Sequence, residues 1–283
     1  MKIAVTAASG HLGGEIVRQL VQELSAENVI GIARSPEKAR ELGVEIRKGD
    51  YNNQSDFDQA LRDVDAVLLV SGMDAPEQRI QQHRNVIQAA KTAGVQKIVY
   101  TSILGPEDGT RFSPIVQSNR QTERDIQDSG MQWAIGRNGL YIEPDIAAVE
   151  DYNREGKVRN CAGDGKCAYT TRPELAYAYR HLLLTDASNG HIFALRGEPM
   201  TQTRLVDFLN HTFDLDLVYE YIDPDTFRQQ RVQALGEHLG NIIAGIYEGI
   251  SQDAFDVESD YVKATGRPHI TWIDYFHQLE AEQ

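Results

Sequence analysis

Cysteine is scarce in this sequence of 283 residues, which carries only Cys161 and Cys167. Two cysteines are too few for a zinc site or a disulfide framework, and in a reducing compartment we expect both to be free thiols, although they could form one bridge. The eight histidines include no H-x-x-x-H pair with a third ligand in view. No metal site is predicted.

Basic charge and long apolar runs are also in short supply. The chain has 28 Lys and Arg against 42 Asp and Glu, a net charge of −14. That balance argues against a nucleic-acid surface, which needs a basic patch. No apolar run approaches the roughly 20 residues of a membrane span, and the chain opens directly on a strand pattern without a signal peptide. We therefore expect a cytoplasmic protein with no membrane or nucleic-acid partner.

The most informative stretch is the first one, residues 2–14. A short apolar run ends at Thr6, small residues follow, and a helical pattern begins at Leu12. Strand, tight loop and helix open a dinucleotide-binding unit, in which backbone N–H groups at the helix start bind a pyrophosphate. Gly10 and Gly13 fit this motif, but Ala7 stands where its first glycine is expected. A glycine motif of this kind is weak evidence without its context.

The context is a series of strands alternating with helices. Strands are predicted at residues 2–6, 28–33, 44–51, 66–70, 97–102, 132–137 and 191–195. One helix is predicted to begin at Leu12, and a second to be capped by Ser35 before Pro36. Further helices are predicted over 55–61, 76–93, 120–128, 143–154 and 172–184. Thr171 and Glu174 form a capping box at the start of the last one. This alternation predicts an α/β, Rossmann-type doubly wound parallel sheet. Its strands end in one crevice.

The final part of the chain is predicted to be mainly helical, with helices at 203–213, 223–239 and 274–280. We therefore expect an NAD(P)-binding Rossmann domain over residues 1–195 and a smaller portion over 196–283 on the substrate side. Residues 140–170 are expected to contribute to the substrate side as well.

Arg34 ends the second strand, where an NAD-specific site usually places Asp or Glu for the ribose 2′-hydroxyl. No acid occupies residues 32–35. An arginine can stack on adenine and form a charge-assisted hydrogen bond to a 2′-phosphate, so NADPH is favoured over NADH. Asp50, at the exit of the third strand, could accept from the adenine amino group or form an ordinary Asx turn, and both interpretations stay open.

The usual proton-transfer groups of an alcohol dehydrogenase are missing. Ser102 occupies the serine position at the end of the fifth strand, but none of the twelve tyrosines is followed four residues later by lysine. No G-x-S-x-G elbow occurs either. We predict no catalytic side chain. An acceptor that needs no strong acid, such as a quinone, fits this absence, because the protein then contributes proximity and orientation.

Two further groups have structural interpretations. His83 could face the crevice from its helix, but a hydrogen-bonded structural histidine is favoured. The carboxylate pairs Asp214/Asp216 and Asp223/Asp225 are explained by loop and capping roles.

Several stretches together resemble the NmrA-like, atypical short-chain dehydrogenase/reductase family, and most of all its type 2 NAD(P)H:quinone oxidoreductases. They are Ala8-Ser9-Gly10-His11-Leu12-Gly13, residues 33–39, residues 82–91, Tyr100-Thr101-Ser102, Arg137-Asn138-Gly139-Leu140-Tyr141 and Ala162-Gly163-Asp164-Gly165-Lys166. The resemblance covers roughly residues 1–195. It implies a quinone pocket between the sheet domain and the C-terminal helices.

The resemblance also implies a set of NADPH contacts at the carboxyl ends of the strands. They are Ala7, Ala8, Ser9, Gly10, His11, Leu12, Arg34, Ser71, Gly72, Met73, Asn138, Gly139, Leu140, Tyr141, Ile142, Glu143 and Thr171. Two alternatives to a quinone reductase remain: an NADP(H)-binding redox sensor without turnover, which the same family includes, and a sugar-nucleotide epimerase, which shares the fold but lacks the residues. A homodimer stays open.

Overall fold

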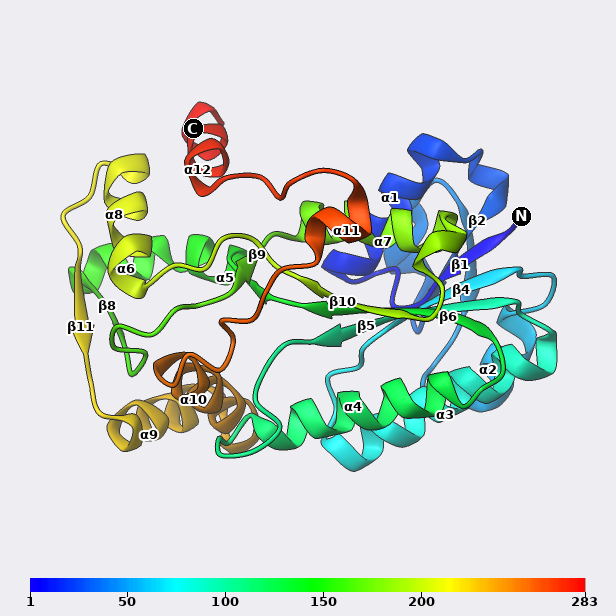
Figure 1. Ribbon diagram of the computed structural model, residues 1–283, viewed down its shortest axis with the longest axis horizontal. Helices are drawn as coiled ribbons and strands as arrows, with labels where there is room; N and C mark the ends of the chain where they lie inside the picture. Colours follow the sequence, from blue (N-terminus) through cyan, green and yellow to red (C-terminus); the bar gives the residue numbers. More distant parts are fainter. Residues whose placement is uncertain (283) are drawn as a thin grey trace.

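A seven-stranded, fully parallel sheet forms the centre of the computed structural model, which describes residues 1–282 (Figure 1). The strand order is β10-β6-β5-β4-β1-β2-β3. Their bounds are β1 (Ile3–Val5), β2 (Val29–Ala33), β3 (Glu45–Lys48), β4 (Ala66–Val70), β5 (Lys97–Ile103), β6 (Gln132–Asn138) and β10 (His191–Leu195). The predicted α/β, Rossmann-type fold is confirmed. Because the chain reverses direction across the sheet between β1 and β4, the switch point lies there.

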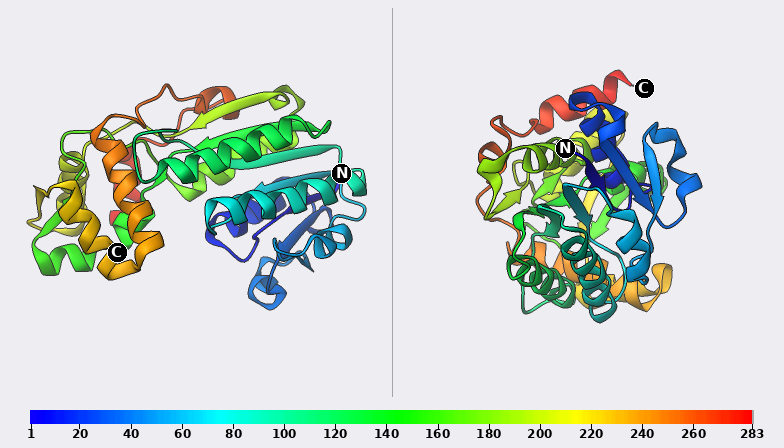
Figure 2. Two further views of the ribbon diagram at one scale, coloured as in Figure 1. Left: turned by 90° about the horizontal axis from the view of Figure 1, so that it is seen from below. Right: turned by 90° about the vertical axis from the view of Figure 1, so that its right-hand side faces the viewer.

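Helices cover both faces of this sheet, because alternate residues of each strand point to opposite sides. Val99 packs with α1 (His11–Glu23) and α7 (Arg172–Leu184), whereas its neighbour Ile98 packs with α2 (Gln54–Ala60), α3 (Pro76–Ala93) and α4 (Ser113–Gln127). Figure 1 shows α1 and α7 above the sheet and α3 and α4 below it, and the left view of Figure 2 looks onto the α3 and α4 layer. Helix α3 illustrates the local signals: Pro76 opens it and Gly94, with φ of 75°, ends it in the left-handed region.

A second group of elements lies beyond the carboxyl ends of the strands (Figure 1). It holds two small parallel sheets, β7 (Leu140–Tyr141) with β9 (Tyr169–Thr170) and β8 (Lys157–Asn160) with β11 (Val218–Tyr221). Its helices are α5 (Glu143–Ala147), α6 (Val149–Glu155), α8 (Gln202–Phe213), α9 (Pro224–Leu235), α10 (Glu237–Ser251) and α12 (Trp272–Ala281). The chain also returns to the main sheet, where α11 (Tyr261–Thr265) packs on α7 and β10. Three short 3-10 helices, η1 (Ala26–Asn28), η2 (Pro36–Leu42) and η3 (Asp186–Ser188), complete the described chain.

Several predicted boundaries are wrong. The helix predicted over 120–128 begins at Ser113, and the one predicted over 223–239 is two helices, because Gly236 takes φ of 81° between α9 and α10. The helix predicted over 143–154 is divided into α5 and α6 around Ala148. Strands β7, β8, β9 and β11 were not predicted, since strands of two to four residues depend on partners far along the chain. Among residues 1–282, no helix combines the length and apolar character that crossing a membrane requires.

Candidate cofactor site

The loop between β1 and α1 has the geometry of a phosphate-binding turn. Gly10 is the N-cap residue of α1 and no side chain caps this helix start, so the first N–H groups of the helix face outward beside the exposed Ser9 and His11. Such an end binds anions through these donors and the helix dipole. Gly13 is required here, because a Cβ atom at this position would lie 2.4 Å from the Ala7 carbonyl oxygen.

Ala7 has a backbone that normally belongs to glycine. Its φ is 50°, in the left-handed region, and its carbonyl accepts a hydrogen bond of 2.9 Å from the Gly10 N–H. The alanine therefore takes the conformation of the missing glycine, and the turn keeps its shape with local strain at one residue.

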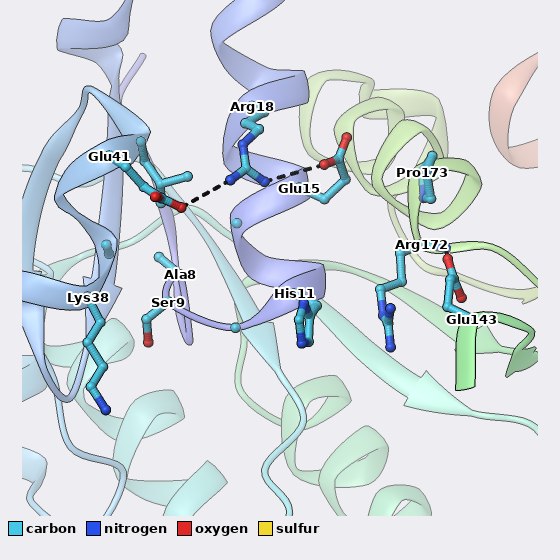
Figure 3. A pocket seen from close by; sticks show the side chains of 14 residues that line it. Ala8, Ser9, His11, Glu15, Arg18, Lys38, Glu41, Glu143, Arg172 and Pro173 are labelled. Carbon is cyan, nitrogen blue, oxygen red and sulfur yellow. Dashed lines mark hydrogen bonds and ion pairs between the residues drawn. The ribbon is translucent and has the colours of Figure 1, made fainter. Parts of the chain in front are cut away.

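A cavity of about 400 Å³ opens beside this loop (Figure 3). Ser9 and Lys38 lie on one side of it, and His11 and Arg172 on the other. Its lining residues are Ala8, Ser9, Gly10, His11, Gly14, Glu15, Arg18, Lys38, Ala39, Glu41, Leu42, Glu143, Arg172 and Pro173. Arg18 lies 3.5 Å from both Glu15 and Glu41, and so connects α1 to η2. The cavity therefore offers helix N–H groups and two further cations, Lys38 and Arg172, to a phosphorylated ligand.

Arg34 and Lys38 both follow β2, but they differ in position. Arg34 is exposed and does not line the cavity, whereas Lys38 does. Neither has an ion-pair partner within residues 1–282. Ser35 is the N-cap residue of η2 and Pro36 is its first residue, as predicted. The Ser35 side chain makes no capping hydrogen bond, and its backbone carbonyl accepts from the Lys38 N–H instead. Sequence reasoning missed Lys38, although its place in Ser35-Pro36-Glu37-Lys38, one turn after Arg34, is a usable signal.

Side chains from three other elements hold the end of β4. The N–H of Val70 donates to Thr6 Oγ1 at 2.9 Å, that of Ser71 to Thr101 Oγ1 at 2.9 Å, and that of Gly72 to His83 Nε2 at 3.0 Å. Three consecutive donors are thus satisfied where the strands diverge and the ladder ends. Ser71 Oγ further donates to Asn119, and Met73 is 75% exposed at the crevice.

His83 is structural. Since its Nε2 accepts from Gly72, the proton sits on Nδ1, which donates to Thr122 Oγ1 at 2.9 Å. Burial, assisted by the nearby Arg79 charge, lowers the pKa of His83 to about 3. The ring is neutral at physiological pH and does not serve as a proton donor to a ligand.

Residues 138–143 connect β6 to α5 at the same edge. Asn138 Oδ1 accepts from the Tyr179 hydroxyl at 2.5 Å, and Gly139 allows the backbone to pass Ala168, whose oxygen would lie 2.4 Å from a Cβ. Arg172 lies over the Tyr141 ring with its guanidinium carbon 5.4 Å from the ring centre. Leu140 and Tyr141 are half-buried and Ile142 is fully buried.

Glu143 and Thr171 converge on the start of α7. Glu143 Oε1 accepts from the Arg172 N–H at 2.6 Å, and Glu143 Oε2 is buried without a hydrogen-bond partner. Thr171 Oγ1 accepts from the Glu174 N–H at 3.2 Å, which confirms the predicted N-cap. The predicted reach of Glu174 back to Thr171 is wrong, because Glu174 binds Arg267 through both oxygens, at 2.9 and 2.7 Å.

Other candidate groups have structural partners. Ser102 donates to Glu123 Oε1 at 2.5 Å, within a buried cluster that includes Arg120 and Arg137. The Asp50 carboxylate accepts from the Asn52 N–H at 2.9 Å, which is the Asx turn. Asp223 caps α9 by accepting from the Thr226 N–H at 3.0 Å.

The two cysteines are free, as expected, and both are buried. Burial raises the pKa of Cys161 to about 11 and that of Cys167 well above its usual value. Within residues 1–282, no three His, Cys, Asp or Glu side chains gather in an arrangement that could hold a metal ion.

Known proteins resemble this chain along nearly its whole length. The model of an NAD(P)H-binding family matches residues 7–160. Quinone oxidoreductase 2 of Escherichia coli is 32% identical, with 98% of each chain covered. Its crystal structure in complex with NADPH matches with a TM-score of 0.89 at 31% identity, over 98% of this chain and 99% of that one. Triphenylmethane reductase of Citrobacter sp., complexed with NADP(H), matches with a TM-score of 0.88 at 29% identity, over 98% and 100%. The chain belongs to the NAD(P)H-binding, NmrA-like family, as the sequence motifs indicated.

Proposed function

We propose that this protein is an NADPH-dependent reductase that transfers a hydride directly to a quinone or a similar electrophilic small molecule. The observation that carries the proposal is the cavity beside the β1–α1 loop, where open helix N–H groups, Lys38 and Arg172 surround a space for a phosphorylated cofactor. Relatives named as a quinone oxidoreductase and a triphenylmethane reductase, each complexed with NADPH or NADP(H), support the same activity.

In this proposal the N–H groups of Ser9, His11 and Leu12 hold the pyrophosphate, because those of Ala8 and Gly10 already donate to the carbonyls of Ile32 and Ala7. Arg34 and Lys38 hold the 2′-phosphate, because both are cations that follow β2 and neither has an ion-pair partner among residues 1–282. The nicotinamide half extends along the ends of β4 and β6. There the fixed loop Ser71–Met73, residues 138–143 and Thr171 provide its contacts. Glu143 Oε2, which is buried without a partner, is an acceptor for a hydroxyl or amide of that half.

The bound cofactor supplies the hydride, and the chain orients it. The end of β4 is held by Thr6, Thr101 and His83, so the surface beneath the cofactor does not need to reorganise during the reaction. Ser102 is bound to Glu123 and His83 is neutral, so neither donates a proton to the acceptor. The proton that completes the reduction comes from water.

We place the acceptor between the strand ends and the second group of elements, which comes from residues 140–170 and, apart from α11, from residues 196–283. The net charge of −14 supports a small-molecule partner over nucleic acid.

The test is to mix the purified protein with NADPH and a series of benzoquinones and to follow the nicotinamide absorbance. We expect oxidation well above the uncatalysed rate. NADPH binding without turnover for any quinone would instead support the redox-sensing alternative, and absence of binding would refute both.

A further inference from the structure

A buried arginine without a partner lies near the start of α3. Arg79 is 4% exposed, its Nε atom has no hydrogen-bond partner, and no carboxylate within residues 1–282 lies at ion-pair distance from it. Two arginines of similar burial are paired: Arg120 binds Glu107 and Glu123, and Arg196 binds the Val257 carbonyl and lies 3.5 Å from Asp256. An unpaired buried charge is costly, and Arg79, unlike the other two arginines, has no partner that offsets this cost.

The position of Arg79 follows from its helix. His83, four residues later and therefore on the same face, reaches Gly72 at the end of β4. Helical side chains lean toward the helix start, so Arg79 lies one turn closer than His83 to the carboxyl edge of the sheet. In Figure 1 this end of α3 lies on the side of the C-terminal helices. Burial lowers the pKa of Arg79, and nearby Tyr100 and Asp74 oppose that shift.

Two neighbouring features fit the same kind of ligand. Helix α3 has 18 residues and its N-cap, Ala75, provides no side-chain cap, so its dipole adds positive potential at this edge. Gln82 Oε1 is also buried without a partner, and it lies near Gly72, 3.2 Å from where a Cβ of that residue would stand. An unused cationic donor and an unused acceptor therefore lie three residues apart near the start of α3. Together they suit a ligand oxygen that changes its protonation state. The arginine donates to this oxygen while it is an anion, and the glutamine oxygen accepts from it once it is a hydroxyl.

We propose that Arg79 is a catalytic residue that binds the acceptor oxygen on which negative charge develops during hydride transfer. This inference depends on the proposed quinone reductase activity. The acceptor gains a hydride from the reduced nicotinamide, whose C–H bond breaks and which is thereby oxidised. The acceptor oxygen then carries the charge beside Arg79 until a proton from water neutralises it. A fixed donor at such an oxygen replaces the acid that the sequence lacks.

The test compares two acceptors in wild type and in Arg79→Gln. Reduction of a benzoquinone places negative charge on oxygen, whereas hydride addition to a cationic triphenylmethane dye gives a neutral product with no oxyanion. We expect Arg79→Gln to lower kcat/KM about 100-fold with the quinone and to leave the dye rate within a factor of about 3. Arg79→Lys retains the charge and should recover part of the quinone rate. Arg84→Gln, an exposed arginine of the same helix, is the matched control.

NADPH affinity, measured by fluorescence titration, checks that each variant is folded and locates the effect. An equal loss with both acceptors means a structural role and overturns the inference. Weaker NADPH binding assigns Arg79 to a cofactor phosphate and overturns it too, as does an unchanged quinone rate, which would mean that buried water satisfies the arginine. A wild type that binds NADPH without reducing quinones refutes the proposed function itself.

A second measurement does not depend on dye turnover. Nitrophenolate and the uncharged nitroanisole are compared as competitive inhibitors. Wild type should prefer the anion, and Arg79→Gln should lose that preference. The same preference in both proteins would contradict the role of Arg79.

Discussion

The Nε2 atom of His83 accepts a hydrogen bond of 3.0 Å from the backbone N–H of Gly72, and this contact determines the protonation state of the ring. A protonated imidazole has no acceptor to offer, so protonation breaks the contact that holds the end of β4. Burial, together with the nearby Arg79 charge, lowers the pKa of His83 to about 3, so the ring stays neutral and keeps this contact at physiological pH.

His83 should make the protein less stable in mild acid. The unfolded chain binds a proton at this residue below about pH 6.5, while the folded protein does not until about pH 3. Stability from His83 is therefore complete above pH 6.5 and falls as the pH drops, by about 1.4 kcal/mol per unit. Urea unfolding at several pH values should show a shallower slope for His83→Gln than for wild type. Equal slopes would contradict this, and the exposed His277→Gln is the control.

Ala7→Gly should stabilise the protein. An alanine at φ of 50° is strained, and glycine adopts that conformation freely. We expect a gain of about 1 kcal/mol in the free energy of unfolding, measured in urea, after the greater flexibility of glycine in the unfolded chain is included. The control, Ala234→Gly in helix α9, should lose about 0.5 to 1 kcal/mol. A loss at both positions would show that Ala7 is not strained.

Arg34 and Lys38 should determine the preference for NADPH. Arg34→Ala and Lys38→Ala should each weaken NADPH binding about tenfold, since each removes one of the charge-assisted hydrogen bonds that we propose to the 2′-phosphate. NADH binding should change little. Side-by-side titrations with the two cofactors measure this, and Arg40→Ala, exposed in the same 3-10 helix, is the control. Equal wild-type affinities for NADPH and NADH would refute a 2′-phosphate site.

The Glu174–Arg267 pair should hold the segment before α12 against α7. Burial raises the pKa of Glu174 and the hydrogen bonds from Arg267 lower it, with a net decrease. Its stabilisation is therefore present above the unfolded pKa near 4.5 and is lost as the pH falls below it.

Glu174→Gln should cost about 2 to 3 kcal/mol at neutral pH, less than a fully buried pair because Arg267 is 37% exposed. It should also speed hydrogen exchange over residues 261–272. The surface pair Lys263–Asp260 provides a comparison: Lys263→Gln should cost no more than about 0.5 kcal/mol. A constant difference between wild type and Glu174→Gln down to pH 3 would contradict the assigned role.

The sheet and the phosphate loop could be predicted because their signals are local. Residues 66–70 are apolar without interruption, and Gly10 and Gly13 stand directly between a strand and a helix. Strands β8 and β11 could not be predicted. They pair Asn160 with Tyr221 across a long stretch of chain, and neither segment is apolar enough to indicate a strand by itself.

The same distinction applies to individual residues. Arg34 could be predicted as a cofactor ligand because it directly follows a strand. Lys38 could not, because it lines the cavity only through the turn of η2 back toward the β1–α1 loop. Arg79 has no sequence signal at all. Only the burial of its helix face and the missing partner single it out.

The end of β4 also has a consequence for the order of folding. Its Val70 and Ser71 amides are bound by side chains 64 and 30 residues away in sequence, those of Thr6 directly after β1 and of Thr101 on β5. Contacts of such separation close large loops and form after local helices. The end of β4, where we propose that the nicotinamide binds, is therefore complete only once β1, β4 and β5 have docked. Recovery of NADPH binding during refolding should thus lag behind the appearance of helical structure. Binding of the cofactor would then mark the point at which the sheet is complete.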